Sequence, residues 1–172
     1  MEIKRVVEVQ LDREQLEKIF FDNSLIKTFK NSDEREKFFN RWCGQYLKDY
    51  PTQFYLALIE KRLVGYLAGH TNSKKALSEF QIPGHDLFEE YYDQYPAHLH
   101  INCDENHQGM GIGKKLMMAY MDELRDKGIA GVHIITSIGA KNSGFYAALG
   151  FDIVDFREFK GSKMIMMGKK LS

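Results

Sequence analysis

The sequence predicts an α/β fold in which a sheet carries helices on both faces. Runs typical of strands alternate with stretches of helical spacing along the chain. Residues 130–137 ("AGVHIITS") form a nearly continuous apolar run, which is typical of a buried strand. A strand, a glycine-rich turn and a helix follow one another over residues 97–128. The expected order is strand, two helices, two strands, an insertion, strand, helix, strand, helix and two strands.

In the N-terminal part, alternating apolar and polar residues predict a first strand. The spacing of apolar residues then becomes helical and predicts a helix, at whose start Asp12 and Gln15 resemble a capping box. Asn31 or Ser32 is expected to cap a second helix with an aromatic stripe. Two β-rich runs around a tight turn predict a hairpin. The expected bounds are strand 3–10, helices 11–21 and 31–50, hairpin 52–70, and an irregular, polar insertion 71–96 with a short helix near 85–96.

In the C-terminal part, the clearest helix follows the glycine-rich turn, because its apolar residues recur at helical spacing and a glycine ends it. That apolar face consists of Ile112, Leu116, Met117, Tyr120, Met121 and Leu124. The expected bounds are strand 97–104, helix 111–128, strand 130–137, short helix 142–150 and strands 151–159 and 163–170.

Composition excludes several classes of protein. The 172 residues are expected to form one domain, 1–172, with 71–96 inserted between the third and fourth strands. Twenty-four basic and 24 acidic residues leave no net charge to attract nucleic acid or an anionic membrane. Two cysteines build no disulfide framework, and no signal segment or apolar span is apparent, so a cytoplasmic protein is expected.

The segment "NHQGMGIGKK" (106–115) places glycines at alternate positions between a strand and a helix. The first N–H groups of a helix lack intrahelical partners and lie at the positive end of its dipole. Glycines let a phosphate approach these groups, and Lys114 and Lys115 add positive charge nearby. The segment therefore predicts an anion site, although a tight turn without a ligand has the same glycines.

Two familiar phosphate motifs do not fit. The P-loop needs a glycine five residues before Gly113, where Gln108 stands, and the dinucleotide fingerprint has different glycine spacing. The pattern Q/R-x-x-G-x-G/A does fit and resembles the pyrophosphate loop of the Gcn5-related N-acetyltransferases. "GAKNSGFYAALGF" (139–151), about 30 residues downstream, resembles a second motif of that family. The chain also looks like the acetyltransferase-like C-terminal domain of O-GlcNAcase and its bacterial relatives.

The resemblance implies a mostly antiparallel mixed sheet whose fourth and fifth strands splay apart to admit the pantetheine arm of acetyl-CoA. A bulge in the fourth strand would free backbone groups to bind the arm. Asn142 would bind the arm or cap its own helix. The implied cofactor-binding residues are Ile101, Asn102, Cys103, Gln108, Gly109, Met110, Gly111, Ile112, Gly113, Lys114, Asn142 and Tyr146.

Catalytic roles are implied for three residues. Tyr146 stands where the family commonly has a general acid that protonates the departing sulfur, and the alternative is packing beside the arm. His98 and His100 share one strand face and titrate in the range of a general base, although such a pair is also common in a core. Asp104 and Glu105 are rival bases. No further residues complete a zinc site with the histidine pair.

The sequence thus predicts an acetyl-CoA-dependent N-acetyltransferase that acts by direct attack of a primary amine on the thioester. A CoA-binding module with little or no transferase activity is the alternative, and a plain nucleotide-binding module is a third reading. The acceptor is a small molecule or a protein amine, with no nucleic acid, membrane or metal involved. A homodimer is left open.

Overall fold

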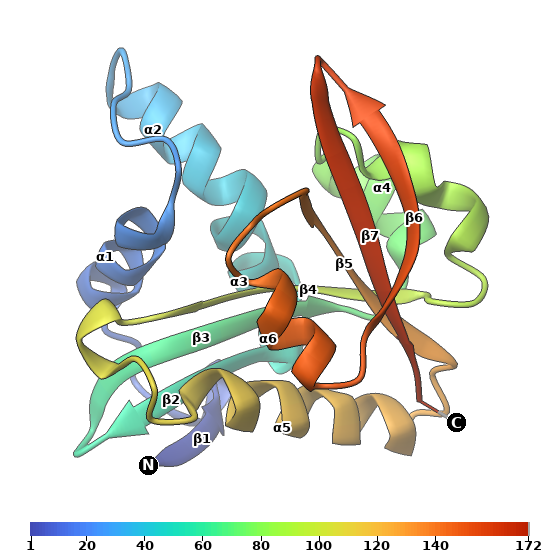
Figure 1. Ribbon diagram of the computed structural model, residues 1–172. Coiled ribbons are helices and arrows are strands. Elements are labelled where there is room, and N and C mark those ends of the chain that lie inside the picture. The colour runs from blue at the N-terminus through green and yellow to red at the C-terminus, as the bar shows by residue number, and fades with distance from the viewer. Residues whose placement is uncertain (172) are drawn as a thin grey trace. The chain divides into compact units, whose positions relative to one another are not determined.

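The computed structural model describes residues 1–171, which form two compact units (Figure 1). The first unit comprises residues 1–69 and 100–120, and the second comprises residues 70–99 and the chain from Met121 onward. Ser172 lies outside the described residues, and the prediction of a single domain stays a prediction. Hydrogen-bonded strands follow the order β1-β2-β3-β4-β5-β7-β6. β4 and β5 run parallel, whereas the pairs β1–β2, β2–β3, β5–β7 and β6–β7 are antiparallel.

The first unit contains three strands, the helices of the N-terminal part and the start of α5. The second helix of the prediction is interrupted, because a π-helical turn at Asn40–Gly44 separates α2 from α3. The elements are β1 Glu2–Arg5, α1 Arg13–Asn23, α2 Ser32–Phe39, α3 Gln45–Asp49, β2 Phe54–Ile59, β3 Arg62–His70 and α5 Ile112–Asp126.

Local capping explains where the first two helices begin. The Asp12 carboxylate accepts a hydrogen bond from the Gln15 backbone N–H at 3.0 Å, and the Asn31 side chain accepts one from Glu34 at 2.9 Å. The Gln15 side chain does not close the predicted capping box, since it donates to the carbonyl of Leu63 at 3.2 Å.

The first strand is shorter than predicted. Residues 6–8 form a 3₁₀ turn instead of extending β1. The Glu8 carboxylate accepts a hydrogen bond from the Arg5 backbone N–H at 2.6 Å, and this bond closes the turn. Alternation alone cannot distinguish such a turn from a strand end.

Within the first unit, helices cover both faces of the sheet. On one face, the Tyr66 ring of β3 lies 6.0 Å from His100, and the His100 ring lies 5.9 Å from Phe20 of α1 and from Trp42 after α2. On the other face, Tyr55 of β2 meets Tyr120 of α5 at 6.0 Å. Because alternate residues of a strand point to opposite faces, the helices on each side of the sheet can pack against side chains of the same two strands, β2 and β3. All six residues predicted for the apolar face of α5 are buried.

The second unit corrects the expectation that residues 71–96 are irregular apart from a short helix. Asn72 caps a regular helix, α4, by accepting a hydrogen bond from Lys75 N–H at 3.0 Å. Ala76 and Phe80 give α4 a buried face at a spacing of four residues, but the helix is only eight residues long, so the pattern is brief in the sequence. The elements are α4 Ser73–Phe80, a 3₁₀ segment His85–Tyr91, β5 Gly131–Ser137, α6 Ser143–Ala148, β6 Asp152–Phe159 and β7 Ser162–Lys170.

The tyrosines of the inserted segment anchor it to the rest of the second unit. Tyr92 is buried and stacks on His133 with ring centroids 4.7 Å apart. The Tyr91 hydroxyl donates to Asp155 of β6 at 2.6 Å, and Arg157 forms ion pairs with Asp155 and Glu90. Figure 1 shows α4 beside the long β6–β7 hairpin.

β4 Ala97–Cys103 runs through both units. Its pairing with β5 covers only Ala97↔Val132 and His98↔His133, although each strand continues beyond these pairs. The splayed fourth and fifth strands of the prediction are therefore confirmed.

Candidate functional site

The glycine-rich turn leaves a helix start open to a ligand. Gly109 and Gly111 have φ angles of +79° and +73°, a left-handed conformation that side chains disfavour. A Cβ at either position would meet no atom within 4 Å, so the backbone there is uncovered. The first bond of α5 runs from Lys115 N–H to the Gly111 carbonyl at 3.1 Å, which leaves the N–H groups before it without helical acceptors. This is the geometry that binds a phosphate.

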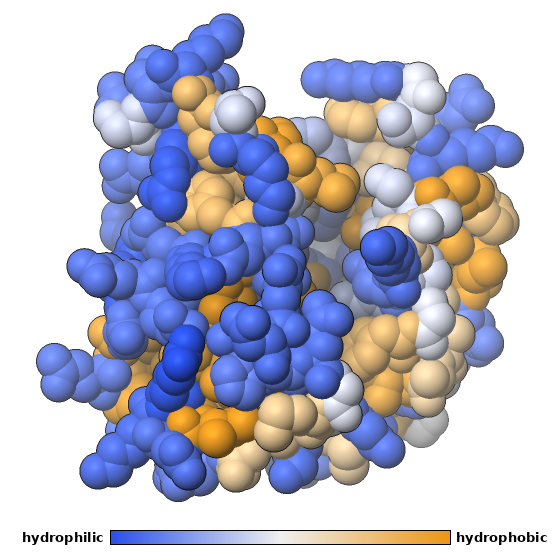
Figure 2. Space-filling model, turned by 60° about the vertical axis from the view of Figure 1, so that its left-hand side comes forward, coloured by the Kyte–Doolittle hydropathy of each residue, from blue (hydrophilic) through white to orange (hydrophobic). Residues whose placement is uncertain are grey.

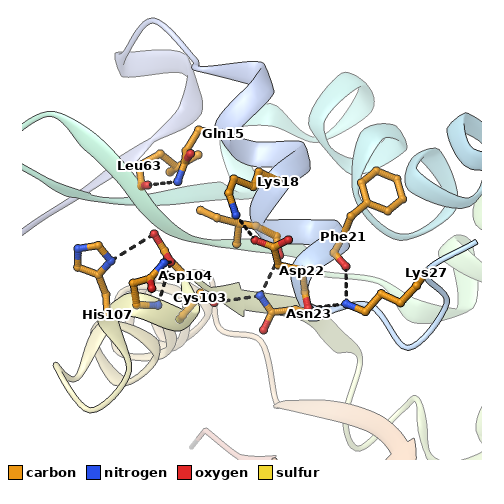
Figure 3. A network of polar contacts seen from close by, with 12 residues as sticks. Gln15, Lys18, Phe21, Asp22, Asn23, Lys27, Leu63, Cys103, Asp104 and His107 are labelled. Carbon is orange, nitrogen blue, oxygen red and sulfur yellow. Dashed lines mark hydrogen bonds and ion pairs between the residues drawn. The ribbon is translucent and has the colours of Figure 1, made fainter.

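A polar network fixes the approach to this turn (Figure 3). The Asp104 carboxylate accepts hydrogen bonds from the backbone and the side chain of Asn106, both at 3.0 Å, and lies 3.2 Å from Nδ1 of His107. Burial alone would raise the pKa of Asp104, but these neighbours lower it. Because its oxygens hold the turn, Asp104 lacks support as a rival base.

α1 holds the end of β4 on the other side of the same network. The Asn23 side chain donates to the carbonyls of Ile19 at 2.8 Å and Cys103 at 3.0 Å, as Figure 3 shows. Sequence reasoning missed Asn23, because its partner lies 80 residues away. It also missed Gly65, where a Cβ would lie 2.9 Å from Ile112 and 3.3 Å from the Asn102 carbonyl. A glycine inside a strand is the signal that indicates such a close approach.

The predicted arm-binding segment of β4 presents alternate side chains to opposite faces. The Asn102 amide donates to the Tyr66 hydroxyl at 2.9 Å, on the α1 side. Cys103 faces Gly65, on the α5 side. Burial raises the pKa of the Cys103 thiol to about 11, so it is protonated at neutral pH. A thiol in this state supports a packing role rather than an acyl-cysteine route.

His100 lies in an aromatic pocket of the first unit. Its ring centroid is 5.9 Å from those of Phe20 and Trp42 and 6.0 Å from that of Tyr66. Nδ1 lies 3.1 Å from the Tyr66 hydroxyl. Burial lowers the pKa of His100 to about 4, so the imidazole is neutral at physiological pH.

His98 belongs to a buried group of histidines in the second unit. Its Nδ1 lies 2.8 Å from Ser73 Oγ, and its ring stacks on His70 at 5.6 Å. His133 lies 5.8 Å away and His85 6.1 Å away. Burial, together with the neighbouring histidines, holds the pKa of His98 well below its usual range. This arrangement supports packing rather than a catalytic role for His98.

The second family-like motif forms α6 in the second unit. Tyr146 is buried, with its ring 5.2 Å from Phe145 and 5.6 Å from Phe151. Asn142 stands at the N-cap position, but its side chain makes no capping bond, which overturns the capping alternative. Its Oδ1 accepts a long hydrogen bond of 3.4 Å from Thr136 instead.

The predicted site residues therefore divide between the units. The first unit brings together the glycine turn, the Ile101–Cys103 segment and His100, and the second contains His98, Asn142 and Tyr146. Of the loop residues, Gln108, Met110 and Lys114 are exposed and Ile112 is buried in the core.

A cavity of about 340 Å³ lies between the end of α1 and the start of α2. Its apolar wall includes Phe21 and Phe29, and its cations are Lys27 and Arg35. The Arg35 guanidinium lies 3.7 Å from the centre of the Phe21 ring. Figure 2 shows this side of the molecule, where apolar atoms appear between hydrophilic ones.

Neither a metal centre nor a membrane-spanning helix is present in the described part of the chain. Over residues 1–171, no group of three or more histidine, cysteine, aspartate or glutamate side chains is arranged to hold a metal ion. Within the same range, no helix has the length and apolar character needed to cross a membrane.

A mixed α/β sheet with an open glycine turn at a helix start is a fold that can hold a phosphorylated cofactor, and comparison with known proteins identifies its family. The family model described as "Acetyltransferase (GNAT) family" matches residues 14–151. The chain belongs to this family, and it is an acetyltransferase with acetyl-CoA as the donor. No match was found among curated proteins.

Solved structures share the fold over nearly the whole chain. The structure of SsHAT is 19% identical with a TM-score of 0.75, covering 99% of this chain and 98% of that one. An agmatine N-acetyltransferase mutant is 14% identical with a TM-score of 0.67, covering 98% of both chains. The putative acetyltransferase yncA from Salmonella typhimurium, solved with acetyl-CoA, is 16% identical with a TM-score of 0.60, covering 99% and 94%.

Proposed function

We propose that this protein transfers the acetyl group of acetyl-CoA to a primary amine by direct attack on the thioester. The observation that carries the proposal is the uncovered glycine backbone before α5, with Gly109 and Gly111 in left-handed conformations and open space above both. Backbone N–H groups from Gln108 to Lys114 bind the pyrophosphate, and residues 101–103 bind the pantetheine arm.

The chemistry needs no covalent enzyme intermediate. The amine lone pair forms a bond to the thioester carbon, and the carbon–sulfur bond then breaks. The departing sulfur takes up a proton, so that the products are an acetamide and CoA thiol. We assign this proton delivery to the Tyr146 hydroxyl and contact with the arm to Asn142. His100 contacts the reacting groups, whereas His98 is structural.

The acceptor is a small-molecule or protein amine. One solved structure with this fold is named an agmatine N-acetyltransferase, which supports a small primary amine without identifying it. The cavity near α1 and α2 offers aromatic and cationic contacts for part of an acceptor. We place the protein in the cytoplasm and leave open whether it forms a homodimer.

The alternative function is a CoA-binding module with little or no transferase activity. The run "YPAHLHINCDENHQGMGIG", which resembles the acetyltransferase-like domain of O-GlcNAcase, favours this alternative. A fold can persist without its chemistry, so activity must be measured rather than inferred.

The test is calorimetric titration with acetyl-CoA, with desulfo-CoA and ATP as comparison ligands, followed by a thiol-release assay against a panel of amines. Binding selective for CoA compounds together with amine-dependent thiol release is the expected result. Selective binding without release for any amine would favour the binding module. Preference for ATP would refute the assignment of the glycine turn to CoA.

A further inference from the structure

The hydroxyl of Tyr66 is the centre of a hydrogen-bonded group beneath His100. Tyr66 is fully buried, and its ring stacks on Phe54 with centroids 5.6 Å apart. Its oxygen lies 3.1 Å from His100 Nδ1 and 2.9 Å from Asn102 Nδ2, and it is hydrogen-bonded to the Cys43 thiol. A buried hydroxyl in such a group has one proton to give and two lone pairs to receive protons.

Counting protons decides which atom donates to which. The Asn102 amide nitrogen only donates, so the Tyr66 proton goes to His100 or to Cys43. An imidazole nitrogen is a far better acceptor than a thiol sulfur. Burial raises the pKa of the Cys43 thiol above its usual range, so its sulfur keeps a proton that it can donate. One arrangement therefore satisfies every group: Tyr66 donates to His100 Nδ1, and Asn102 and Cys43 donate to the Tyr66 oxygen.

This arrangement fixes the tautomer of His100. A neutral imidazole has one N–H, and when Nδ1 accepts a hydrogen bond the proton is on Nε2. Nε2 of His100 has no hydrogen-bond partner among residues 1–171. Nε2 of His100 is also not among the fully buried side-chain atoms that lack a hydrogen bond in that range, so it retains some contact with solvent.

We propose that His100 acts in acetyl transfer as a neutral hydrogen-bond donor through Nε2–H, and not as the general base. The proposal rests on the proposed function. As the amine nitrogen bonds to the thioester carbon, an electron pair of the carbonyl moves onto its oxygen, and a donor aimed at a substrate oxygen stabilises that charge. The pair then returns, the carbon–sulfur bond breaks, and the proton that nitrogen loses ends on sulfur. His100 begins and ends with the same proton.

Three residues act through His100 rather than on the substrate. Tyr66 is a positioning residue, because its proton holds Nδ1 as an acceptor and thereby keeps the other proton on Nε2. Asn102 orients Tyr66 by donating to its oxygen, and the Cys43 thiol is hydrogen-bonded to the same hydroxyl. An amine acceptor must then arrive in its neutral form or lose its proton to water.

The direct test is the tautomer of His100, measured by long-range nitrogen–proton NMR on the whole protein labelled with ¹⁵N-histidine. We expect Nε2 protonated and Nδ1 unprotonated from pH 6 to 8. In Tyr66→Phe the other tautomer should become populated, whereas the control Tyr46→Phe, which removes a buried phenol not bonded to His100, should leave the tautomer unchanged. A protonated Nδ1 in the wild-type protein would overturn the proposal, whatever the fold of the variants.

Kinetics separate a donor from a base. The amide nitrogen of glutamine can take the place of imidazole Nε2 but cannot accept a proton, and asparagine places its amide near Nδ1 instead. We expect turnover to fall on the order of 10²-fold in His100→Ala and His100→Asn, and to stay within about tenfold of wild type in His100→Gln. Equal losses in all three variants, together with a pH–rate limb that only the wild type shows, would establish a base instead. The NMR measurement needs no substrate, so the tautomer is tested independently of activity. Lack of turnover with every amine would refute the proposed function, whereas a protonated Nδ1 would refute the assignment of His100.

Discussion

Acidification should unfold this protein through its buried histidines, and His133 gives the clearest case. Its side chain is fully buried, its Nδ1–H donates to the Tyr95 carbonyl at 2.7 Å, and its Nε2 has no partner among residues 1–171. Its ring lies between Tyr92 at 4.7 Å and His98 at 5.8 Å. No carboxylate is among these contacts to stabilise a second proton.

The magnitude follows from proton linkage. Burial lowers the pKa of His133 from 6.5 to about 4, so the unfolded chain binds more protons than the folded one between these values. The stabilisation is complete above pH 6.5 and is lost progressively as the pH falls toward 4. Two-state linkage gives a loss of about 2 kcal/mol from His133 alone between pH 7.5 and 5.0. The lowered pKa values of His98 and His100 act in the same direction.

The assay is urea unfolding at several pH values between 7.5 and 5.0, for the wild type and for His133→Phe. Phenylalanine preserves a ring against Tyr92 but binds no proton. The variant loses the bond to Tyr95, which costs about 1 kcal/mol at every pH. Between pH 7.5 and 5.0, the free energy of unfolding of the variant should therefore decrease by about 2 kcal/mol less than that of the wild type. The same pH dependence in both proteins would refute the reasoning.

Three further predictions concern the cofactor turn, the acid and packing. Gly111→Glu should abolish CoA binding in calorimetry, because the new carboxylate would repel the pyrophosphate. Gly111→Gln causes the same backbone strain without the charge, so it should retain more of the CoA affinity. Equal CoA affinities of the two variants would argue against an anion at this turn. Tyr146→Phe should bind acetyl-CoA nearly as wild type but turn over more slowly, and undiminished turnover would reassign Tyr146 to packing. Gly69→Ala should destabilise the protein by about 1–3 kcal/mol in denaturant unfolding, because the new Cβ would lie 2.5 Å from the Tyr120 ring. The control Gly144→Ala should be neutral or stabilising, because its Cβ would meet no atom within 4 Å.

Much of the fold could be predicted because its signals are local. The α5 face recurs at helical spacing over six residues that are all buried. Asp12 and Asn31 cap their helices because a capping side chain bonds a backbone N–H three residues away. The glycine turn is equally local, since its conformation depends on the absence of side chains at Gly109 and Gly111. These features need no distant partner.

The failures of prediction lie where a second local structure, or a contact with other residues, competes with the expected one. Residues 6–8 leave the strand pattern for a turn closed by Glu8. α4 buries Ala76 and Phe80 within the second unit, and its amphipathic pattern extends over only eight residues, too few to stand out in the sequence. Asn142 occupies a cap position without capping. The turn at residues 6–8 is decided by the local bond between Arg5 and Glu8, whereas α4 is decided by what its buried face packs against.

The sequence by itself determined the order of the strands along the chain, the glycine turn and the family, because each depends on residues that are adjacent or regularly spaced. It also placed His98 and His100 on one face of one strand, with identical chemistry. Only the tertiary structure distinguished them. His98 is bonded to Ser73 within a group of buried histidines, whereas His100 meets Tyr66, which is in turn bonded to Asn102 and Cys43. The proton position on an imidazole is set by the group that its other nitrogen meets, and folding alone brings that group into contact.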